Sequence, residues 1–363
     1  MNKILLLTNK IDPFPKGGRE LLCKLNHDIL KQIYKNNCIL LELPKEPMKS
    51  ITEKIKAFNG HIDGISSKLI RKVLNEIKTK NIEKVFIDGS NLGELAKRIK
   101  VKYPQVRIYT FFHNVESKFF LDSLKQNYRL HTLAVYIVNY LAEKKAVKYS
   151  DKIICINERD SQLLQKTYGE SATDIYPMAL EDKLPSNHTS LVHEIKEKFV
   201  LFVGGTFYAN RVGITWFVKN VAPSLHIKTY IVGRGFEKFR SELELNDKVI
   251  VIGEVEDLSQ WYHDATFIIA PIFDGSGMKT KVAEALMYGK KIIGTPEAFV
   301  GYEDIINEVG LICTTDNEFI TAINNEEKKV ISSFYLKLRK IYEESYSLKS
   351  AKDRMKNIIK DKK

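Results

Sequence analysis

Short apolar segments alternate with amphipathic ones along the first half of the chain. Five of these segments predict buried strands, at 3–8, 38–43, 84–88, 107–113 and 152–157. Helices are predicted over 18–35 and 159–168, and longer polar–apolar stretches separate the other strands. Strands that are separated by helices indicate βαβ units and a parallel sheet.

The same alternation starts again after a polar stretch at 181–190, which we interpret as an interdomain linker. The second set of predicted strands lies at 198–204, 228–233, 248–253, 266–271 and 290–295. We therefore predict an α/β fold with two Rossmann-like domains, 1–185 and 191–335. The residues after about Ser332 predict helices, and we expect 336–363 to pack back toward the first domain.

Composition limits the class of protein. The 363 residues are 44% hydrophobic and 10% aromatic, which is enough for two full cores. The opening apolar run is too short for a signal peptide, and no stretch of ~18 apolar residues predicts a membrane span. The four cysteines lack CxxC spacing, so they favour neither a zinc site nor a disulfide framework. We expect a cytoplasmic protein.

Positive charge is concentrated in the first half of the chain. Residues 1–190 hold 32 Lys and Arg against 21 Asp and Glu, a balance of +11, whereas residues 191–363 hold 25 against 24, a balance of +1. This asymmetry suggests that the first half faces an anionic partner: a nucleic acid, a membrane surface or a phosphorylated acceptor. The alternative is a lysine-rich surface that only keeps the protein soluble.

The segment 266–295 carries the strongest chemical signal. A predicted strand ends at Pro271, and a glycine-rich turn at 274–277 opens a predicted helix, 277–288, which Gly289 ends. Backbone N–H groups at a helix start lack intrahelical partners, and the helix dipole favours an anion there. A diphosphate would fit this turn.

Side chains on the same predicted helix add to this site. Gly277, Thr280, Lys281 and Glu284 follow helical spacing and would share one face. The Glu284 carboxylate could accept two hydrogen bonds from the vicinal hydroxyls of a ribose. Lys279 or Lys281 could contact a phosphate. The alternative is a glycine-started helix that carries an ordinary, solvated glutamate.

This segment resembles the nucleotide-sugar-binding motif of GT-B glycosyltransferases, specifically the retaining group called family 4. That motif has two glutamates separated by seven residues, and Glu284 matches the second of them. The first would fall on Ser276, where this sequence departs. One branch of the family has a Gly/Ser-rich turn followed by a basic residue and Lys, here Lys279 and Lys281. The resemblance therefore implies that 276–281, including Met278, contacts the donor.

Three further segments resemble the same family in the same order. In 202–218, the family's usual Arg falls on Gly205 and its usual Lys on Arg211. In 231–236, the resemblance places Arg234 near the nucleotide. In 251–267, it places the base near Glu254 and Val255.

The N-terminal half resembles the family more weakly. The segment 12–26 is similar to a glycine loop beside the catalytic cleft, with Gly17 and Gly18 at a helix start. A glycine pair lets backbone amides approach a phosphate closely. The segment 111–120 is similar to a strand end that carries a catalytic His, here His113. The resemblance implies catalytic roles for His113 and Gly18 and a donor contact for Gly17, whereas a lone His at a strand end is otherwise a packed structural residue.

A basic, apolar segment at 128–150 has two interpretations. About a dozen largely apolar residues precede Lys144, Lys145 and Lys148. The basic end could contact anionic lipid. The alternative is a buried helix of the first domain with a basic end.

Several other chemistries lack their motifs. The sequence has no Asp-x-Asp pair, HExxH, GxSxG or P-loop, and no GxGxxG follows its first strand. We therefore expect no metal and no cofactor, the UDP- or GDP-linked sugar being a substrate, and no nucleic-acid partner.

The resemblance implies two domains facing across a cleft and a metal-independent, retaining transfer of a sugar. The implied acceptor is a saccharide or a lipid-diphosphate-linked saccharide in surface polysaccharide biosynthesis, at the inner face of the cell membrane, with the protein cytoplasmic or peripheral there. Two alternatives stay open: a GT-B-like nucleotide-sugar epimerase and a non-catalytic sugar-binding protein.

Overall fold

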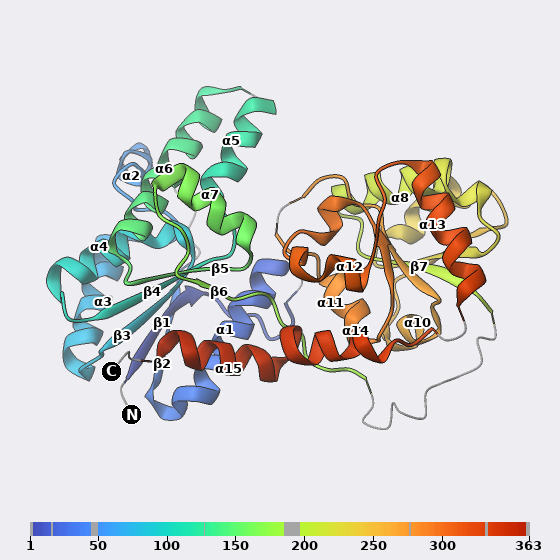
Figure 1. The fold of residues 1–363 in the computed structure, drawn as a ribbon. Helices are drawn as coiled ribbons and strands as arrows, with labels where there is room; N and C mark the ends of the chain where they lie inside the picture. Colours follow the sequence, from blue (N-terminus) through green and yellow to red (C-terminus); the bar gives the residue numbers. More distant parts are fainter. Residues whose placement is uncertain are drawn as a thin grey trace. The chain divides into compact units, whose positions relative to one another are not determined.

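The chain forms two α/β units in a computed structural model, each described below by itself (Figure 1). The structure describes residues 3–15, 17–44, 50–126, 128–184, 197–275, 277–330 and 333–360. One unit comprises Met1–Pro177 with Ala351–Lys363, and the other Met178–Ser350. The predicted α/β class with two Rossmann-like parts is confirmed. Most of the predicted linker, 185–190, lies outside the described residues.

The first unit contains a parallel six-stranded sheet in the order β2-β1-β3-β4-β5-β6. Its strands are β1 (Ile4–Asn9), β2 (Cys38–Leu43), β3 (Lys84–Asp88), β4 (Arg107–Phe112), β5 (Lys152–Cys155) and β6 (Asp174–Ile175). The five predicted strands are confirmed, and β6 is additional because two residues are too few to show a pattern. The strand order reverses between β1 and β3, so polar loops meet there at the carboxyl edge.

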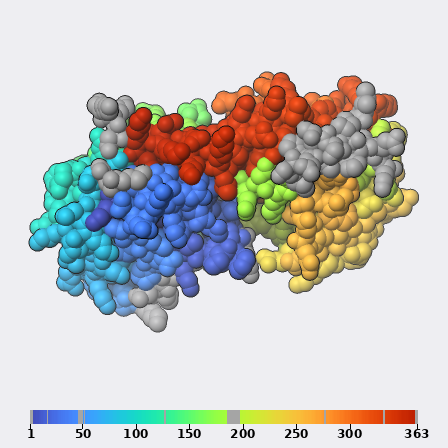
Figure 2. Space-filling view, turned by 90° about the horizontal axis from the view of Figure 1, so that it is seen from below, coloured from blue at the N-terminus to red at the C-terminus, as the bar shows by residue number. Residues whose placement is uncertain are grey.

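Helices cover both faces of this first sheet (Figure 1). They are α1 (Gly18–Tyr34), α2 (Ile51–Ala57), α3 (Ser67–Lys80), α4 (Gly93–Lys102), α5 (Glu116–Gln126), α6 (Leu130–Tyr149) and α7 (Glu158–Tyr168), joined by the end of α15 (Leu348–Ile359). The red end of the chain lies along the blue N-terminal part of the first unit (Figure 2). The Lys84 ammonium, at the start of β3, donates to the Ile359 carbonyl at 2.8 Å. Among the described residues, no helix is both long and apolar enough to cross a bilayer.

The second unit contains another parallel six-stranded sheet, in the order β12-β11-β10-β7-β8-β9. Its strands are β7 (Phe199–Val203), β8 (Lys228–Val232), β9 (Val249–Gly253), β10 (Phe267–Ala270), β11 (Ile292–Gly294) and β12 (Gly310–Ile312). The five predicted strands are again confirmed, and β12 is additional. The order reverses between β7 and β10, where ligands bind in doubly wound sheets.

Helices connect and follow the strands of the second unit. They are α8 (Tyr208–Asn220), α9 (Arg240–Leu243), α10 (Ser259–Asp264), α11 (Thr280–Met287), α12 (Ile306–Val309), α13 (Asp316–Lys329) and α14 (Leu336–Ile341). Helix α8 lies directly against the end of β10, because a Cβ on buried Gly213 would stand 1.7 Å from the Pro271 carbonyl oxygen. Glycine at this position therefore lets the start of α8 reach the carboxyl edge of the sheet.

The predicted start of the glycine-opened helix is wrong. The helix begins at Thr280 with Lys279 at its N-cap, three residues after the predicted start at Gly277. Gly277 has φ +68, a left-handed conformation that a right-handed helical turn cannot contain. It therefore lies in the preceding loop and not on a helical face with Glu284. The predicted end is confirmed, since Gly289 has φ +59 immediately after the helix.

Candidate functional site

Glycine turns line the carboxyl edge of the second sheet. The Gly204 N–H donates to the Val232 carbonyl at 3.0 Å, and the Gly233 N–H donates to the Gly253 carbonyl at 2.7 Å. A Cβ on Gly233 would stand only 1.8 Å from the Gly204 oxygen, so these turns lie backbone against backbone. A Cβ on Gly205 would meet only the Arg234 carbonyl, at 3.7 Å, which leaves open space over this turn.

Four of the predicted donor-binding side chains lie around these turns. Arg211, in the first turn of α8, is exposed, and its guanidinium lies 5.2 Å from the ring centroid of Phe239. Arg234 is exposed, and its carbonyl accepts the Thr206 N–H at 3.3 Å. Glu254 is exposed just after β9, and Val255 packs partly against the core. The structure thus brings these residues to one edge of the sheet.

The loop before α11 is held by several contacts. The Tyr302 hydroxyl donates to the Lys279 carbonyl at 3.0 Å. The Lys279 ammonium donates to the Gly277 carbonyl and to Glu297, both at 2.9 Å. A proposed phosphate contact by Lys279 must therefore compete with Glu297, which sequence reasoning missed.

The structure describes one of the two other predicted residues of this loop. Met278 packs closely on Gly301, where a Cβ would stand 2.4 Å from the Met278 Cγ. The Met278 side chain thus packs against Gly301 and the core of the second unit. Ser276 lies outside the described residues.

Glu284 is half-buried and oriented by a neighbouring tyrosine. One carboxylate oxygen accepts the Tyr262 hydroxyl at 2.7 Å, and the ring of Tyr262 stacks on Tyr288 with centroids 5.1 Å apart. Burial raises the pKa of Glu284. Its other oxygen accepts no hydrogen bond from the described residues. The alternative of an ordinary solvated glutamate does not fit this environment.

Lys281 lies beneath the glycine turn that follows β7. Its buried ammonium donates to the Asn210 side-chain oxygen at 3.0 Å and lies 4.3 Å from the ring centroid of Phe202. The Asn210 amide in turn donates to the Gly205 carbonyl at 2.9 Å. Burial lowers the pKa of Lys281 to about 7. Asn210 was not found from the sequence, because nothing local marks it as a partner of a lysine 71 positions away.

The carboxyl edge of the first sheet is built from side chains instead. Asp88, at the end of β3, accepts the Thr8 hydroxyl at 2.7 Å and the Asn26 amide at 2.9 Å, and its carboxylate lies 2.9 Å from the His113 Nε2. Burial alone would raise the pKa of Asp88, but His113 and these hydrogen bonds hold it below its usual value. Asp88 was missed because a carboxylate at a strand end is common.

His113 is buried and fixed on one side only. Its Nε2 contacts Asp88, whereas its Nδ1 is buried and has no hydrogen-bond partner among the described residues. The ring packs edge-on against Phe111, with centroids 4.9 Å apart. His113 is therefore packed, as the structural alternative predicts, and yet retains one unused ring nitrogen.

A thiol completes this polar cluster. The Cys23 Sγ lies 3.7 Å from the His113 Nε2, and ligand atoms of Cys23, Asp88 and His113 all lie within 4.8 Å of one another. Burial, followed by the charge of Asp88, raises the pKa of the Cys23 thiol far above its usual value. A thiol that resists deprotonation is a poor metal ligand, and Asp88 already accepts other hydrogen bonds. These residues thus fit a hydrogen-bonded cluster better than a metal site.

Gly17 and Gly18 stand open at the start of α1. Gly17 is the N-cap with φ −127, and Gly18 is the first helical residue. A Cβ on either would meet nothing within 4 Å. Both residues are exposed, and neither packing nor a positive φ requires glycine at these positions.

The predicted basic cluster at the end of α6 is only partly a surface feature. The Lys145 ammonium donates to the Asn59 carbonyl at 2.7 Å and contacts Glu94 at 2.6 Å. Lys144 and Lys148 are exposed. The inclusion of Lys145 in a lipid-facing cluster is therefore wrong, because its ammonium contacts Glu94 and the Asn59 carbonyl within the first unit.

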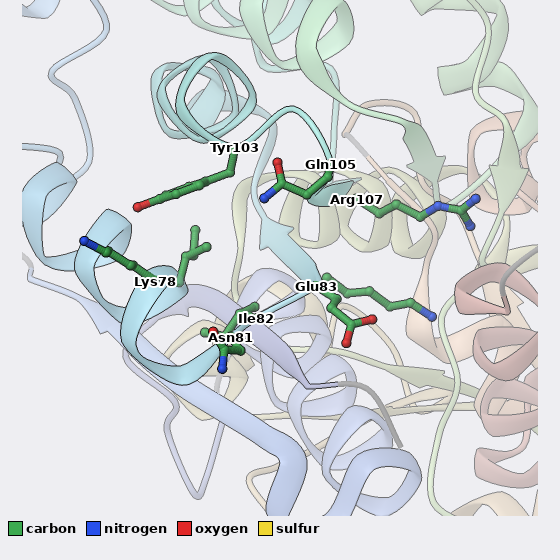
Figure 3. Close-up of a pocket in the computed structure, with 9 residues that line it drawn as sticks. Lys78, Asn81, Ile82, Glu83, Tyr103, Gln105 and Arg107 are labelled. Atoms are coloured by element: carbon green, nitrogen blue, oxygen red, sulfur yellow. The ribbon is translucent and has the colours of Figure 1, made fainter.

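A cavity of about 640 Å³ lies at the opposite, amino edge of the first sheet (Figure 3). Its lining includes Lys78, Glu83 and Arg107, and the Lys78 and Arg107 side chains point away from each other (Figure 3). None of the predicted site residues lines it. Its basic groups do not converge on one point, so we do not assign the site to this cavity.

Comparisons with known proteins find a family match within the second unit. Residues 197–325 match the family described as Glycosyl transferases group 1. No curated protein matches the sequence. The matched segment contains all the glycine turns and α11 of the second unit.

Solved structures resemble the chain over nearly its whole length. Sucrose-phosphate synthase from Thermosynechococcus elongatus is 15% identical with a TM-score of 0.69, covering 99% of this chain and 98% of that one. Anabaena Alr3699/HepE in complex with UDP is 12% identical with a TM-score of 0.67, covering 98% of both chains. The lipopolysaccharide outer core galactosyltransferase WaaB is 16% identical with a TM-score of 0.65, covering 98% and 99%. At such identities the likeness shows the GT-B fold.

Proposed function

We propose that the chain is a glycosyltransferase that transfers a sugar from a UDP- or GDP-linked donor to a saccharide or lipid-linked saccharide acceptor, because residues 197–325 match the glycosyl transferases group 1 family and the chain has a GT-B fold. One observation carries this proposal. At the reversal point of the second sheet, open glycine turns lie beside a half-buried Glu284, one oxygen of which accepts no hydrogen bond from the part of the chain that the structure describes.

The donor would be held by complementary groups. The free oxygen of Glu284 would accept hydrogen bonds from the ribose hydroxyls, while Tyr262 keeps the carboxylate in place. Backbone N–H groups of the 277–280 loop would face the diphosphate. The exposed guanidiniums of Arg211 and Arg234 would add positive charge.

The first unit would supply the reacting side. We assign the open backbone of Gly17 and Gly18 to contacts with the donor and the transferred sugar. The unpartnered Nδ1 of His113 would accept a hydrogen bond from a sugar hydroxyl, with the ring fixed by Asp88. We assign no general base, because the geometry of the described side chains does not identify one.

The proposed reaction needs neither metal nor cofactor and retains the anomeric configuration. Positive side chains and the α11 dipole would stabilise the leaving diphosphate, which is the task that a metal performs elsewhere. Retention rests on the resemblance to family 4. Turnover is expected to continue unchanged in excess chelator. Loss of turnover that manganese or magnesium restores would contradict this part of the proposal.

We place the reaction in the cytoplasm, at the inner face of the cell membrane, in surface polysaccharide assembly. The +11 balance of the first half supports an anionic neighbour such as a lipid-diphosphate acceptor. The structural likeness to a lipopolysaccharide core galactosyltransferase supports the same process. Lys144 and Lys148 are the exposed residues of the original cluster that could contact lipid.

Incubation with a panel of UDP- and GDP-linked hexoses, without acceptor, tests the reaction class. We expect slow hydrolysis of one donor to free sugar and nucleoside diphosphate. Conversion of a donor into an epimer would instead show an epimerase. Tight donor binding without hydrolysis, and without transfer to any saccharide acceptor, would show a non-catalytic binding protein.

A further inference from the structure

Three charged side chains form a second polar cluster at the carboxyl edge of the first sheet. Arg19, Asp63 and Glu116 come from the start of α1, the loop before α3 and the start of α5. An Arg19 guanidinium nitrogen lies 3.6 Å from an Asp63 carboxylate oxygen, and the two side chains are 38% and 40% exposed. The pair is therefore held together and still open to a ligand.

Glu116 is the member of this cluster whose side chain lacks a partner. It is half-buried, and its carboxylate accepts no hydrogen bond from the part of the chain that the structure describes. Burial raises the pKa of this carboxyl, Arg19 opposes that shift, and Glu143 and Asp63 add to it. His113, whose buried Nδ1 also lacks a partner among the described residues, lies close enough to act on the same carboxyl. A carboxylate that has lost water without gaining a protein donor binds hydroxyl groups favourably.

The start of α5 already holds a negative charge. The buried Glu143 carboxylate accepts the N–H groups of Glu116 at 2.8 Å and of Ser117 at 3.0 Å, and the Tyr168 hydroxyl at 2.9 Å. Two backbone donors that could otherwise bind an anion are therefore occupied. Glu143 also fixes the first turn of α5, on which Glu116 lies.

We propose that Glu116, together with Arg19 and Asp63, binds the hydroxyl groups of an uncharged pyranose of the acceptor and disfavours a phosphorylated sugar. The guanidinium would donate to a hydroxyl oxygen, and the two carboxylates would accept from hydroxyl groups. A phosphate would meet the negative charges of Glu116, Asp63 and Glu143, which the charge of Arg19 does not balance. The inference rests on the proposed function and deepens it, because it names the class of saccharide that the first unit binds. A diphosphate carried by the acceptor would lie outside this cluster.

The next helix along the sheet carries a glutamate at the matching position. Glu158 is the first residue of α7, which follows β5 as α5 follows β4. It is exposed, whereas Glu116 is half-buried. Glu158→Gln therefore removes the same charge from the same kind of helix start without changing the cluster.

Ligand-observed NMR titration of the full chain with methyl glycosides tests the inference. The panel comprises the methyl glycosides of glucose, galactose, mannose and N-acetylglucosamine, with the 6-phosphate of each. We expect at least one uncharged glycoside to bind the wild type more tightly than its 6-phosphate. Glu116→Gln should weaken binding of that glycoside by about 10-fold or more, because a charged acceptor is lost. The same variant should weaken binding of the 6-phosphate less, or strengthen it, because a repelling charge is removed.

Asp63→Asn should shift the preference in the same direction, and it replaces Glu116→Gln if that variant does not fold. Glu158→Gln should keep both wild-type affinities, and Glu116→Gln should keep wild-type affinity for UDP or GDP. The inference is overturned if the wild type prefers the 6-phosphate, or if Glu116→Gln leaves the ratio of the two affinities unchanged.

The nucleotide titration separates this inference from the proposed function. A wild type that binds UDP or GDP but none of the glycosides overturns the inference alone. A loss of UDP or GDP affinity in Glu116→Gln as large as the loss of glycoside affinity also overturns it, because the cluster would then serve the donor. A wild type that binds neither nucleotide overturns the proposed function and this inference with it.

Discussion

The carboxyl edges of the two sheets are built from different parts of the polypeptide. In the first unit, side chains from β1, α1, β3 and the end of β4 converge on the buried carboxylate of Asp88. In the second unit, glycine turns expose backbone, and the nearest charges lie beside or beneath it. Both sheets are parallel, with polar loops at the point where the strand order reverses.

Under the proposed function, this difference would separate two tasks between the two edges. A network of side chains fixes a single ring, here His113, in one orientation. A backbone surface lets a large anion approach several N–H groups at once, which bulky side chains would prevent. Under the proposed function, the first edge would orient a reactive group and the second would hold the donor.

Removal of Asp88 should have the largest effect on stability. Asp88→Ala leaves Thr8, Asn26 and His113 without their shared partner in a buried site, so we expect a loss of about 3–5 kcal/mol of unfolding free energy near neutral pH. Because folding lowers the pKa of Asp88, its contribution is present above its unfolded pKa and is lost as pH falls through its folded pKa.

Urea unfolding of the wild type and of Asp88→Ala, from neutral pH to below pH 4, measures this effect. The two curves of stability against pH should converge at the acid end. A loss below about 1 kcal/mol at neutral pH would show that the cluster is not a buried network.

The second-largest difference in stability should come from adding one methyl group at each of the two edges. Gly213→Ala places a Cβ against the Pro271 carbonyl and pushes α8 away from β10, for which we expect a loss of about 2–3 kcal/mol. Gly17→Ala in the first unit is the matched change, since its Cβ meets nothing within 4 Å. Its stability should change by less than about 0.5 kcal/mol. Similar losses for both variants, measured by thermal melting, would contradict the close approach of α8.

Glu284 tests whether the second edge binds the nucleotide. Glu284→Ala should weaken UDP or GDP binding by roughly 1.5–3 kcal/mol, because a charged hydrogen-bond acceptor is lost. Burial raises the pKa of Glu284, so wild-type affinity should fall as pH drops through that raised pKa, where the carboxylate becomes protonated.

Tyr262→Phe is the control for this variant. It removes the hydroxyl that orients Glu284 but keeps the carboxylate, so it should weaken binding less than Glu284→Ala does. Unchanged nucleotide affinity in Glu284→Ala, with an equal loss of stability, would assign Glu284 a structural role only.

The smallest expected effect concerns the charge of the first unit. Replacing exposed Lys144 and Lys148 by Gln should weaken binding to anionic vesicles by about 1 kcal/mol for each lysine, and added salt should weaken wild-type binding. Lys145→Gln should lower stability instead, because its ammonium contacts Glu94 and the Asn59 carbonyl. If co-sedimentation with vesicles does not depend on the lipid charge, the reason to place the protein at the membrane is removed.

Much of this fold could be predicted from local pattern. Ten strands were predicted within a few residues of their ends, because buried parallel strands are short apolar runs and need no knowledge of their partners. The two additional strands, β6 and β12, contain two and three residues, too few for a pattern. The start of α11 was placed too early because the sequence does not show that Gly277 has a positive φ.

The sequence by itself determined the two Rossmann-like parts and the turns that can approach an anion, because glycine spacing and apolar runs act locally. Only the tertiary structure decided which charges are available there. Lys279 and Lys281 are two residues apart and looked equivalent, yet one contacts Glu297 and the other Asn210, 18 and 71 positions away. Burial and hydrogen-bond partners set the energy of a charge, and both depend on residues that only the folded chain brings together.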